Sequence, residues 1–124
     1  MKLGVRPKRI LLVEDEPTIS QVCLRVLSGE FAVDIAMDGA LAKRMLVKQR
    51  YGLIIIDIMT PVMDGKQLYQ YILREYPGIA KRVIFTTGEL LGGTKSFIEQ
   101  SGRPFLPKPF TPAELMDICC RNIC

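Results

Sequence analysis

Short apolar runs alternate along the chain with longer segments in which apolar residues recur at helical spacing. Three runs are continuously apolar and rich in β-branched residues, as expected of strands covered on both faces. They are residues 10–13, 53–56 and 83–85. Two others differ, since the run 31–36 contains Asp34 and the run 104–107 is bracketed by prolines, which central strands exclude. The pattern predicts three central strands and two edge strands.

The segments between these runs have the pattern of amphipathic helices. They are residues 16–28, 38–50, 66–76, 94–101 and 111–122. In the first, apolar residues recur at offsets of 0, 3, 4, 7 and 8, which places them on one stripe. The last opens with Thr111 as a predicted N-cap, Pro112 at the first helical position and Glu114 completing a capping box. Pro77 and Gly78 are expected to end the third helix.

Five strands that alternate with five helices predict an α/β fold with one parallel sheet, right-handed crossovers and helices on both faces. With the second and fifth strands at the edges, the simplest strand order is 2-1-3-4-5, the flavodoxin-like form of the doubly wound fold. A chain of 124 residues fits a single domain of this kind. Ligands of such folds bind beyond the carboxyl ends of the strands, so the function is expected there.

Composition narrows the class of protein. With 48% hydrophobic and 24% charged residues the chain can support a core, and no apolar run approaches the roughly 20 residues that a bilayer requires. The formal charge of +4 comes from four basic side chains in the first nine residues, and the rest is balanced. Residues 1–8 are therefore expected to be a basic leader or linker remnant before a domain at 9–124. We expect a cytoplasmic protein without membrane insertion or direct nucleic-acid binding.

The chain has four cysteines and no histidine. They are Cys23, Cys119, Cys120 and Cys124. Three crowd the C-terminus, so neither the paired spacing of a zinc ribbon nor a Cys–His nucleophile can be built. We expect reduced thiols that act as small hydrophobic side chains.

Polar residues follow four of the predicted strands. They are Glu14 and Asp15, then Asp57, then Thr86 and Thr87, and finally Lys108. Carboxyl ends of parallel strands share one edge of the sheet, so these groups should converge. Two carboxylates about 4 Å apart repel by on the order of 4 kcal/mol at an effective dielectric near 20, so a counter-cation is expected. Oxygen ligands favour Mg²⁺ or Mn²⁺. Such a pocket can accept a phosphoryl group, with Asp57 as nucleophile. Thr86 is expected to be a sheet-end hydroxyl without a catalytic role.

Four motifs stand in order along the chain: the acidic pair 14–15, DIMTPVMDG at 57–65, FTTG at 85–88 and FLPKPF at 105–110. Together they resemble the receiver domain of two-component response regulators, the family of the single-domain chemotaxis regulator. The resemblance covers residues 9 to 122, nearly the whole chain. It implies that Asp57 accepts phosphate from a histidine kinase or a histidine phosphotransfer protein.

The resemblance also implies roles for the other residues of the pocket. Glu14, Asp15, Asp57 and the backbone carbonyl of Met59 would hold Mg²⁺. Thr87 would bind the phosphoryl group in the active state, and Lys108 would contact it from the opposite side. Phe105 matches an aromatic switch residue, and the bond between Lys108 and Pro109 matches one that is usually cis. Phosphorylation would alter the face formed by the fourth and fifth strands and the fourth helix, and a downstream effector protein would read it.

Three residues depart from the usual pattern of the family, and two segments point to one subgroup of it. Thr60 replaces a common methionine, Pro107 precedes the lysine, and Phe105 lacks the hydroxyl of a tyrosine switch. The sequences of residues 86–89 and 101–105 most resemble those of receivers attached to hybrid histidine kinases. That origin is our first interpretation, with a stand-alone regulator as the alternative.

Two other classes of protein stay open. A phosphatase of the haloacid-dehalogenase type also forms an aspartyl-phosphate, but it needs a second aspartate two residues after the nucleophile, where this chain has Met59. A constitutive binding module would keep the pocket without using it, and would then show no response to Mg²⁺.

Overall fold

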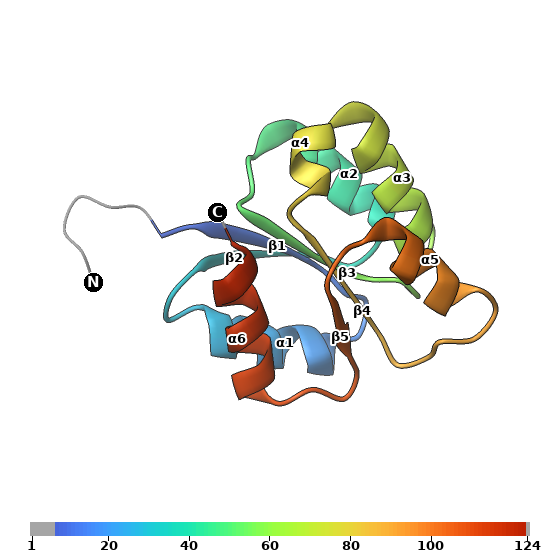
Figure 1. Cartoon of the computed structure of the whole chain (residues 1–124). Coiled ribbons are helices and arrows are strands. Elements are labelled where there is room, and N and C mark those ends of the chain that lie inside the picture. Colours follow the sequence, from blue (N-terminus) through green and yellow to red (C-terminus); the bar gives the residue numbers. More distant parts are fainter. Residues whose placement is uncertain (1–6, 124) are drawn as a thin grey trace.

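The computed structural model describes residues 7–123, and its centre is a parallel sheet of five strands (Figure 1). The strands are β1 (Arg9–Val13), β2 (Ala32–Ala36), β3 (Leu53–Asp57), β4 (Val83–Thr87) and β5 (Phe105–Pro107). Their order, β2-β1-β3-β4-β5, confirms the predicted flavodoxin-like arrangement and its two edge strands. All pairs are parallel, so every strand carries its carboxyl end to the same edge.

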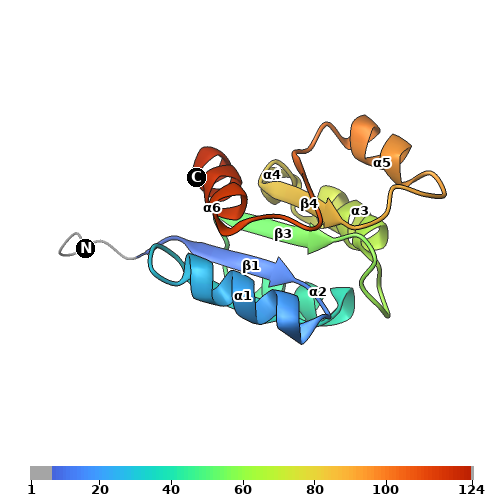
Figure 2. The same ribbon diagram turned by 90° about the horizontal axis from the view of Figure 1, so that it is seen from below.

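Helices cover both faces of the sheet (Figures 1 and 2). They are α1 (Pro17–Leu27), α2 (Gly39–Lys48), α3 (Gly65–Glu75), α4 (Pro77–Ala80), α5 (Thr94–Ser101) and α6 (Pro112–Asn122). Alternate strand residues divide the core into two clusters, one with α1 and α6 and the other with α2 to α5. Ile84 and Leu106 belong to the first cluster, while Phe85 belongs to the second. This alternation decides which strand residues can meet at the site.

The prediction of five helices is wrong by one, because α4 is a separate short helix. Pro77 was expected to end the third helix. Its fixed φ and missing N–H also suit the first turn of a new helix, and here it starts one directly after Tyr76. Strand β4 also runs on to Thr87, two residues past the predicted apolar run, so both threonines belong to the strand.

Polar residues mark where the helices begin. The side chain of Asp38 accepts a hydrogen bond from the Leu41 N–H at the start of α2. Asp64 and Gln67 form a capping box at α3, and Thr111 and Glu114 form the predicted one at α6. These caps satisfy N–H groups that the helices themselves leave unpaired, and they fix the loops beside the site.

The charged residue in the edge strand is accounted for by its partners. Asp34 accepts a hydrogen bond from the Tyr51 hydroxyl at 2.8 Å and forms an ion pair with Arg9 at 3.3 Å. Burial and this hydrogen bond raise the pKa of Tyr51. The network joins β1, β2 and the loop before β3, at the end of the sheet away from the acidic pocket.

The cysteines within the described residues are free thiols. Cys23 and Cys119 are buried, and burial raises the pKa of the first to about 11 and that of the second to about 12. Cys120 is exposed, while Cys124 and the first six residues of the predicted leader lie outside the described part of the chain. No helix among the described residues is long and apolar enough to span a membrane.

Candidate functional site

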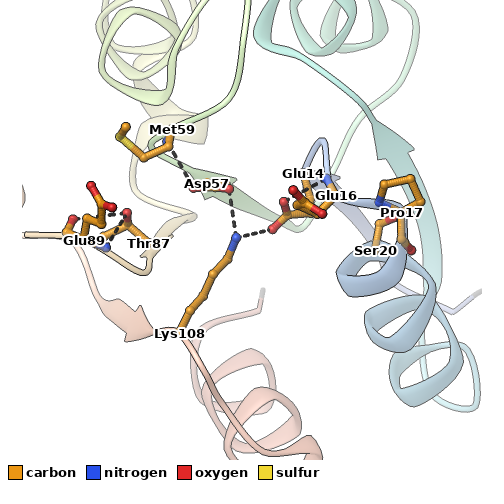
Figure 3. A network of polar contacts seen from close by, with 9 residues as sticks. All are labelled: Glu14, Glu16, Pro17, Ser20, Asp57, Met59, Thr87, Glu89 and Lys108. Atoms are coloured by element: carbon orange, nitrogen blue, oxygen red, sulfur yellow. Dashed lines mark hydrogen bonds and ion pairs between the residues drawn. The ribbon is translucent and has the colours of Figure 1, made fainter.

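Three carboxylates gather at the carboxyl edge of the sheet, and Figure 3 shows two of them, Glu14 and Asp57. Glu14 and Asp15 follow β1, and Asp57 ends β3. One oxygen of each lies within 4.8 Å of an oxygen of the others. Glu14 and Asp57 are buried, and Asp15 is half-buried. This set of oxygen donors fits the hard divalent cation expected from the sequence.

Lys108 supplies a positive charge inside this acidic pocket. Its Nζ lies 2.7 Å from Glu14 Oε1 and 2.9 Å from Asp57 Oδ2 (Figure 3). Burial acts to lower the pKa of Lys108, but its two carboxylate partners outweigh burial and hold that pKa above its ordinary value. For Glu14, burial raises the pKa, the hydrogen bond from Lys108 opposes the rise, and the charge of Asp57 adds to it. Glu14 and Asp57 therefore share one lysine, which leaves the pocket with an excess of negative charge.

The second oxygen of Asp57 is oriented by the backbone that follows it. The Met59 N–H donates to Asp57 Oδ1 at 3.0 Å, while the side chain of Met59 is exposed. Asp57 therefore has both oxygens held, one by a peptide N–H and one by an ammonium group. Such a carboxylate is fixed in orientation at the carboxyl edge of the sheet.

Thr87 ends β4 but makes no hydrogen bond to Asp57 in the described structure. The Thr87 hydroxyl instead contacts the backbone of Glu89, whose N–H donates to it at 3.2 Å. Phe105 is half-buried and packs against the cluster on the α2 to α5 side. The bond between Lys108 and Pro109 is cis. The Thr87 hydroxyl is thus in a state that does not engage the carboxylates of the pocket.

The loop from β3 to α3 is held close to its neighbours by two glycines. A Cβ on Gly39, at the start of α2, would lie 2.1 Å from the carbonyl oxygen of Met63. A Cβ on Gly65 would lie 2.6 Å from the Cα of Ile58. Real Cβ atoms do not approach other atoms this closely, so both positions require glycine for close packing rather than for an unusual φ. The sequence offered no signal for the contact of Gly39 with Met63, because it joins separate segments.

Val62, in the same loop, has a φ of +67° although it is a β-branched residue. The left-handed region costs such a residue on the order of 1–2 kcal/mol. Its side chain is 81% exposed, so little burial offsets that cost. The strain lies five residues after Asp57, in the loop that orients its carboxylate.

We expect Val62→Asn to raise the free energy of unfolding by about 1 kcal/mol, because asparagine tolerates the left-handed region. Urea denaturation followed by circular dichroism measures the change. Val47→Asn is the matched control, since Val47 is 69% exposed in helix α2, where asparagine relieves no strain. Equal effects of the two substitutions would show that Val62 is not strained in solution.

The sheet order, the acidic edge and the partly buried lysine define a doubly wound α/β domain with an acidic site at the carboxyl ends of its strands. The sequence profile of the response regulator receiver domain family matches residues 10–119. The chain belongs to this family and is a receiver domain of two-component systems.

Relatives and solved structures agree with this assignment. Response regulator Rre1 of Synechocystis is 36% identical over 94% of this chain and 52% of its own length. The magnesium-bound receiver domain of the Pseudomonas aeruginosa sensor histidine kinase PA1611 is 35% identical, with a TM-score of 0.79 over 94% of this chain and 97% of that one. A CheY-like receiver domain protein from Methanospirillum hungatei has a TM-score of 0.84 at 26% identity, covering 93% and 92%. This chain spans about half the length of the curated relatives it matches.

Proposed function

We propose that Asp57 is the phospho-acceptor of this receiver domain and that a histidine kinase or a histidine phosphotransfer protein supplies the phosphoryl group. The observation that carries the proposal is the position of the Asp57 carboxylate, buried at the end of a central strand and held by Lys108 and the Met59 N–H. A carboxylate fixed in this way is a suitable nucleophile for phosphorus.

Glu14, Asp15, Asp57 and the backbone carbonyl of Met59 are the proposed ligands of Mg²⁺. The gathering of three carboxylates supports this set, as does the magnesium ion in the cleft of the PA1611 receiver. When bound, the metal neutralises negative charge on the incoming phosphoryl group. Lys108 contributes the other positive charge, and its contact with Asp57 keeps that carboxylate pointed into the pocket.

In the transfer step, an oxygen of Asp57 forms a bond to phosphorus while the bond from phosphorus to the donor breaks. The donor leaves with the electron pair of that bond, so no proton is needed at Asp57. The donor carries away the negative charge of the carboxylate, and the phosphoryl oxygens keep the charge that they bring. Thr87 then turns its hydroxyl from Glu89 towards the phosphoryl group, and Phe105 rotates inwards. These movements alter the face formed by β4, β5 and α5, which a downstream effector reads.

We further propose that the chain works in the cytoplasm as the receiver of a hybrid histidine kinase, with a stand-alone regulator as the alternative. The similarity to the PA1611 receiver supports the first origin. The similarity to Rre1 supports the second. An upstream kinase core in the full-length reading frame would decide between them.

The decisive experiment incubates the protein with acetyl phosphate and Mg²⁺ and measures its intact mass. We expect the wild type to gain one phosphoryl group, with acetate leaving, and Asp57→Asn to gain none. Removal of Mg²⁺ with a chelator should abolish the gain. Asp117→Asn, a change of the same kind on the exposed face of α6, should behave as the wild type. Equal labelling of Asp57→Asn, or rapid turnover of phosphate esters, would overturn the proposal.

A further inference from the structure

Thr86 is buried, with 2% of its surface exposed, and its hydroxyl has no hydrogen-bond partner. It is the one buried side-chain polar atom in this condition among the described residues. Buried polar groups in native proteins are nearly always satisfied, and leaving one unpaired is costly. An unpaired hydroxyl at this position therefore needs an explanation.

The strand register places Thr86 beside the pocket. In β4 it is paired with Asp57 of β3 on one side and Leu106 of β5 on the other. Side chains at paired positions of parallel strands point to the same face, and neighbouring strands are about 4.8 Å apart. That face is the α1 and α6 side, because Ile84 and Leu106 contribute to its core cluster. The Thr86 side chain is therefore the next neighbour of the Asp57 side chain on the sheet.

Lys108 reaches Asp57 from the same face. It lies two residues beyond Leu106, so both side chains are on one face of the extended chain. Its backbone N–H donates to the Thr87 carbonyl, which continues the pairing of β5 with β4. To reach Asp57 in β3, its side chain must cross β4, and its Cβ lies 3.9 Å from the place where a Cβ of Gly88 would stand. Thr86 and Gly88 are alternate residues, so the lysine stem crosses β4 beside Thr86.

The ammonium group of Lys108 has three N–H donors, and two of them are accounted for by Glu14 and Asp57. We propose that Thr86 is a positioning residue whose hydroxyl accepts a hydrogen bond from Lys108 only when Asp57 carries a phosphoryl group. Phosphorylation turns one carboxylate oxygen of Asp57 into the bridging oxygen of an acyl phosphate, and the negative charge then lies on the phosphoryl oxygens, so Lys108 must give up its contact with the carboxylate. The Thr86 hydroxyl then accepts a hydrogen bond from the ammonium group of Lys108 and keeps it beside β4. The inference rests on the proposed role of Asp57 and deepens it.

A hydrogen bond that forms only in the phosphorylated state should favour that state. An interaction shifts an equilibrium by the difference between its free energies in the two states. The same hydroxyl is unsatisfied in the resting state and destabilises it. Thr86→Val keeps the β-branched shape without the hydroxyl, and Thr86→Ser keeps the hydroxyl without the methyl group. The two variants therefore separate hydrogen bonding from packing.

The test measures the affinity of each variant for beryllofluoride with Mg²⁺, a non-covalent substitute for the phosphoryl group, from the shift in urea midpoint with ligand concentration. We expect Thr86→Val to unfold at higher urea than the wild type without ligand, and to bind beryllofluoride about tenfold more weakly. Thr86→Ser should bind as the wild type, although it unfolds at lower urea.

Several outcomes overturn the inference. One is a Thr86→Val variant that binds beryllofluoride as tightly as the wild type. A second is a Thr86→Ser variant as weak as Thr86→Val, which would indicate packing. A third is a loss of ligand-free stability in Thr86→Val, which would mean that the hydroxyl is already satisfied at rest. If the wild type itself neither binds beryllofluoride nor accepts phosphate from acetyl phosphate, the proposed function fails instead.

Discussion

Lys108→Met is expected to lower the free energy of unfolding by about 3 kcal/mol at pH 7.5 in metal-free buffer. Lys108 is the cation that the structure places against the buried carboxylates of Glu14 and Asp57, and 16% of its side chain is exposed. Methionine fills a similar volume but leaves two negative charges facing each other. Breaking a buried ion pair on one side is costly because the remaining charge has no partner.

The loss of stability in Lys108→Met should depend on pH and on Mg²⁺. Burial already raises the pKa of Glu14, and the hydrogen bond from Lys108 opposes that rise, so without the lysine Glu14 holds a proton to higher pH in the folded than in the unfolded protein. Such a group stabilises the fold at low pH, and this contribution is lost as the pH rises through the folded-state pKa. The deficit of Lys108→Met should therefore be smaller at pH 5 than at pH 7.5. Mg²⁺ should also restore more stability to the variant than it adds to the wild type, because it replaces the missing charge.

Urea denaturation at both pH values, with and without Mg²⁺, measures these effects. Lys95→Met is the matched control, since Lys95 is exposed in the first turn of α5 and should change stability little. A Lys108→Met variant as stable as Lys95→Met would show that the lysine does not stabilise the pocket. A deficit independent of pH and Mg²⁺ would assign its role to packing.

The residues of this pocket could be predicted because parallel strands all end at one edge. The apolar runs fixed which residues follow each strand, so Glu14, Asp57 and Lys108 could be grouped without coordinates. The contact of Lys108 with both carboxylates is a matter of side-chain reach, which spacing along the chain does not determine. The roles of Thr87 and Phe105 came from the family resemblance alone, and their movement on phosphorylation remains a prediction.

Other features could not be read from the sequence because they depend on contacts between distant segments or on backbone conformation. The φ of Val62 is set by the closure of the β3–α3 loop, and nothing in its residue type suggests a left-handed conformation. Thr86 was expected to be an ordinary sheet-end hydroxyl, and only its burial and register show that it is unpaired beside Asp57. Helix α4 was missed because Pro77 suits both the end of one helix and the start of the next.

Gly39→Ala is expected to lower the free energy of unfolding by about 3 kcal/mol, at the upper end of the usual cost of overpacking. The added Cβ would lie 2.1 Å from the Met63 carbonyl oxygen and 2.9 Å from the Met63 Cβ. A backbone atom cannot turn aside as a flexible side chain does, so α2 or the β3–α3 loop must move. That loop includes Met59, whose N–H holds Asp57. Phosphorylation by acetyl phosphate should therefore become slower as well.

Gly78→Ala is the control that separates this clash from a general effect of replacing glycine. Gly78 lies in α4 and a Cβ there would meet nothing within 4 Å, so alanine should be neutral or stabilise the helix by up to about 1 kcal/mol. Urea denaturation and the rate of phosphate uptake, measured on both variants, give the comparison. If Gly39→Ala unfolds and accepts phosphate as Gly78→Ala does, the loop is not held against α2 in solution.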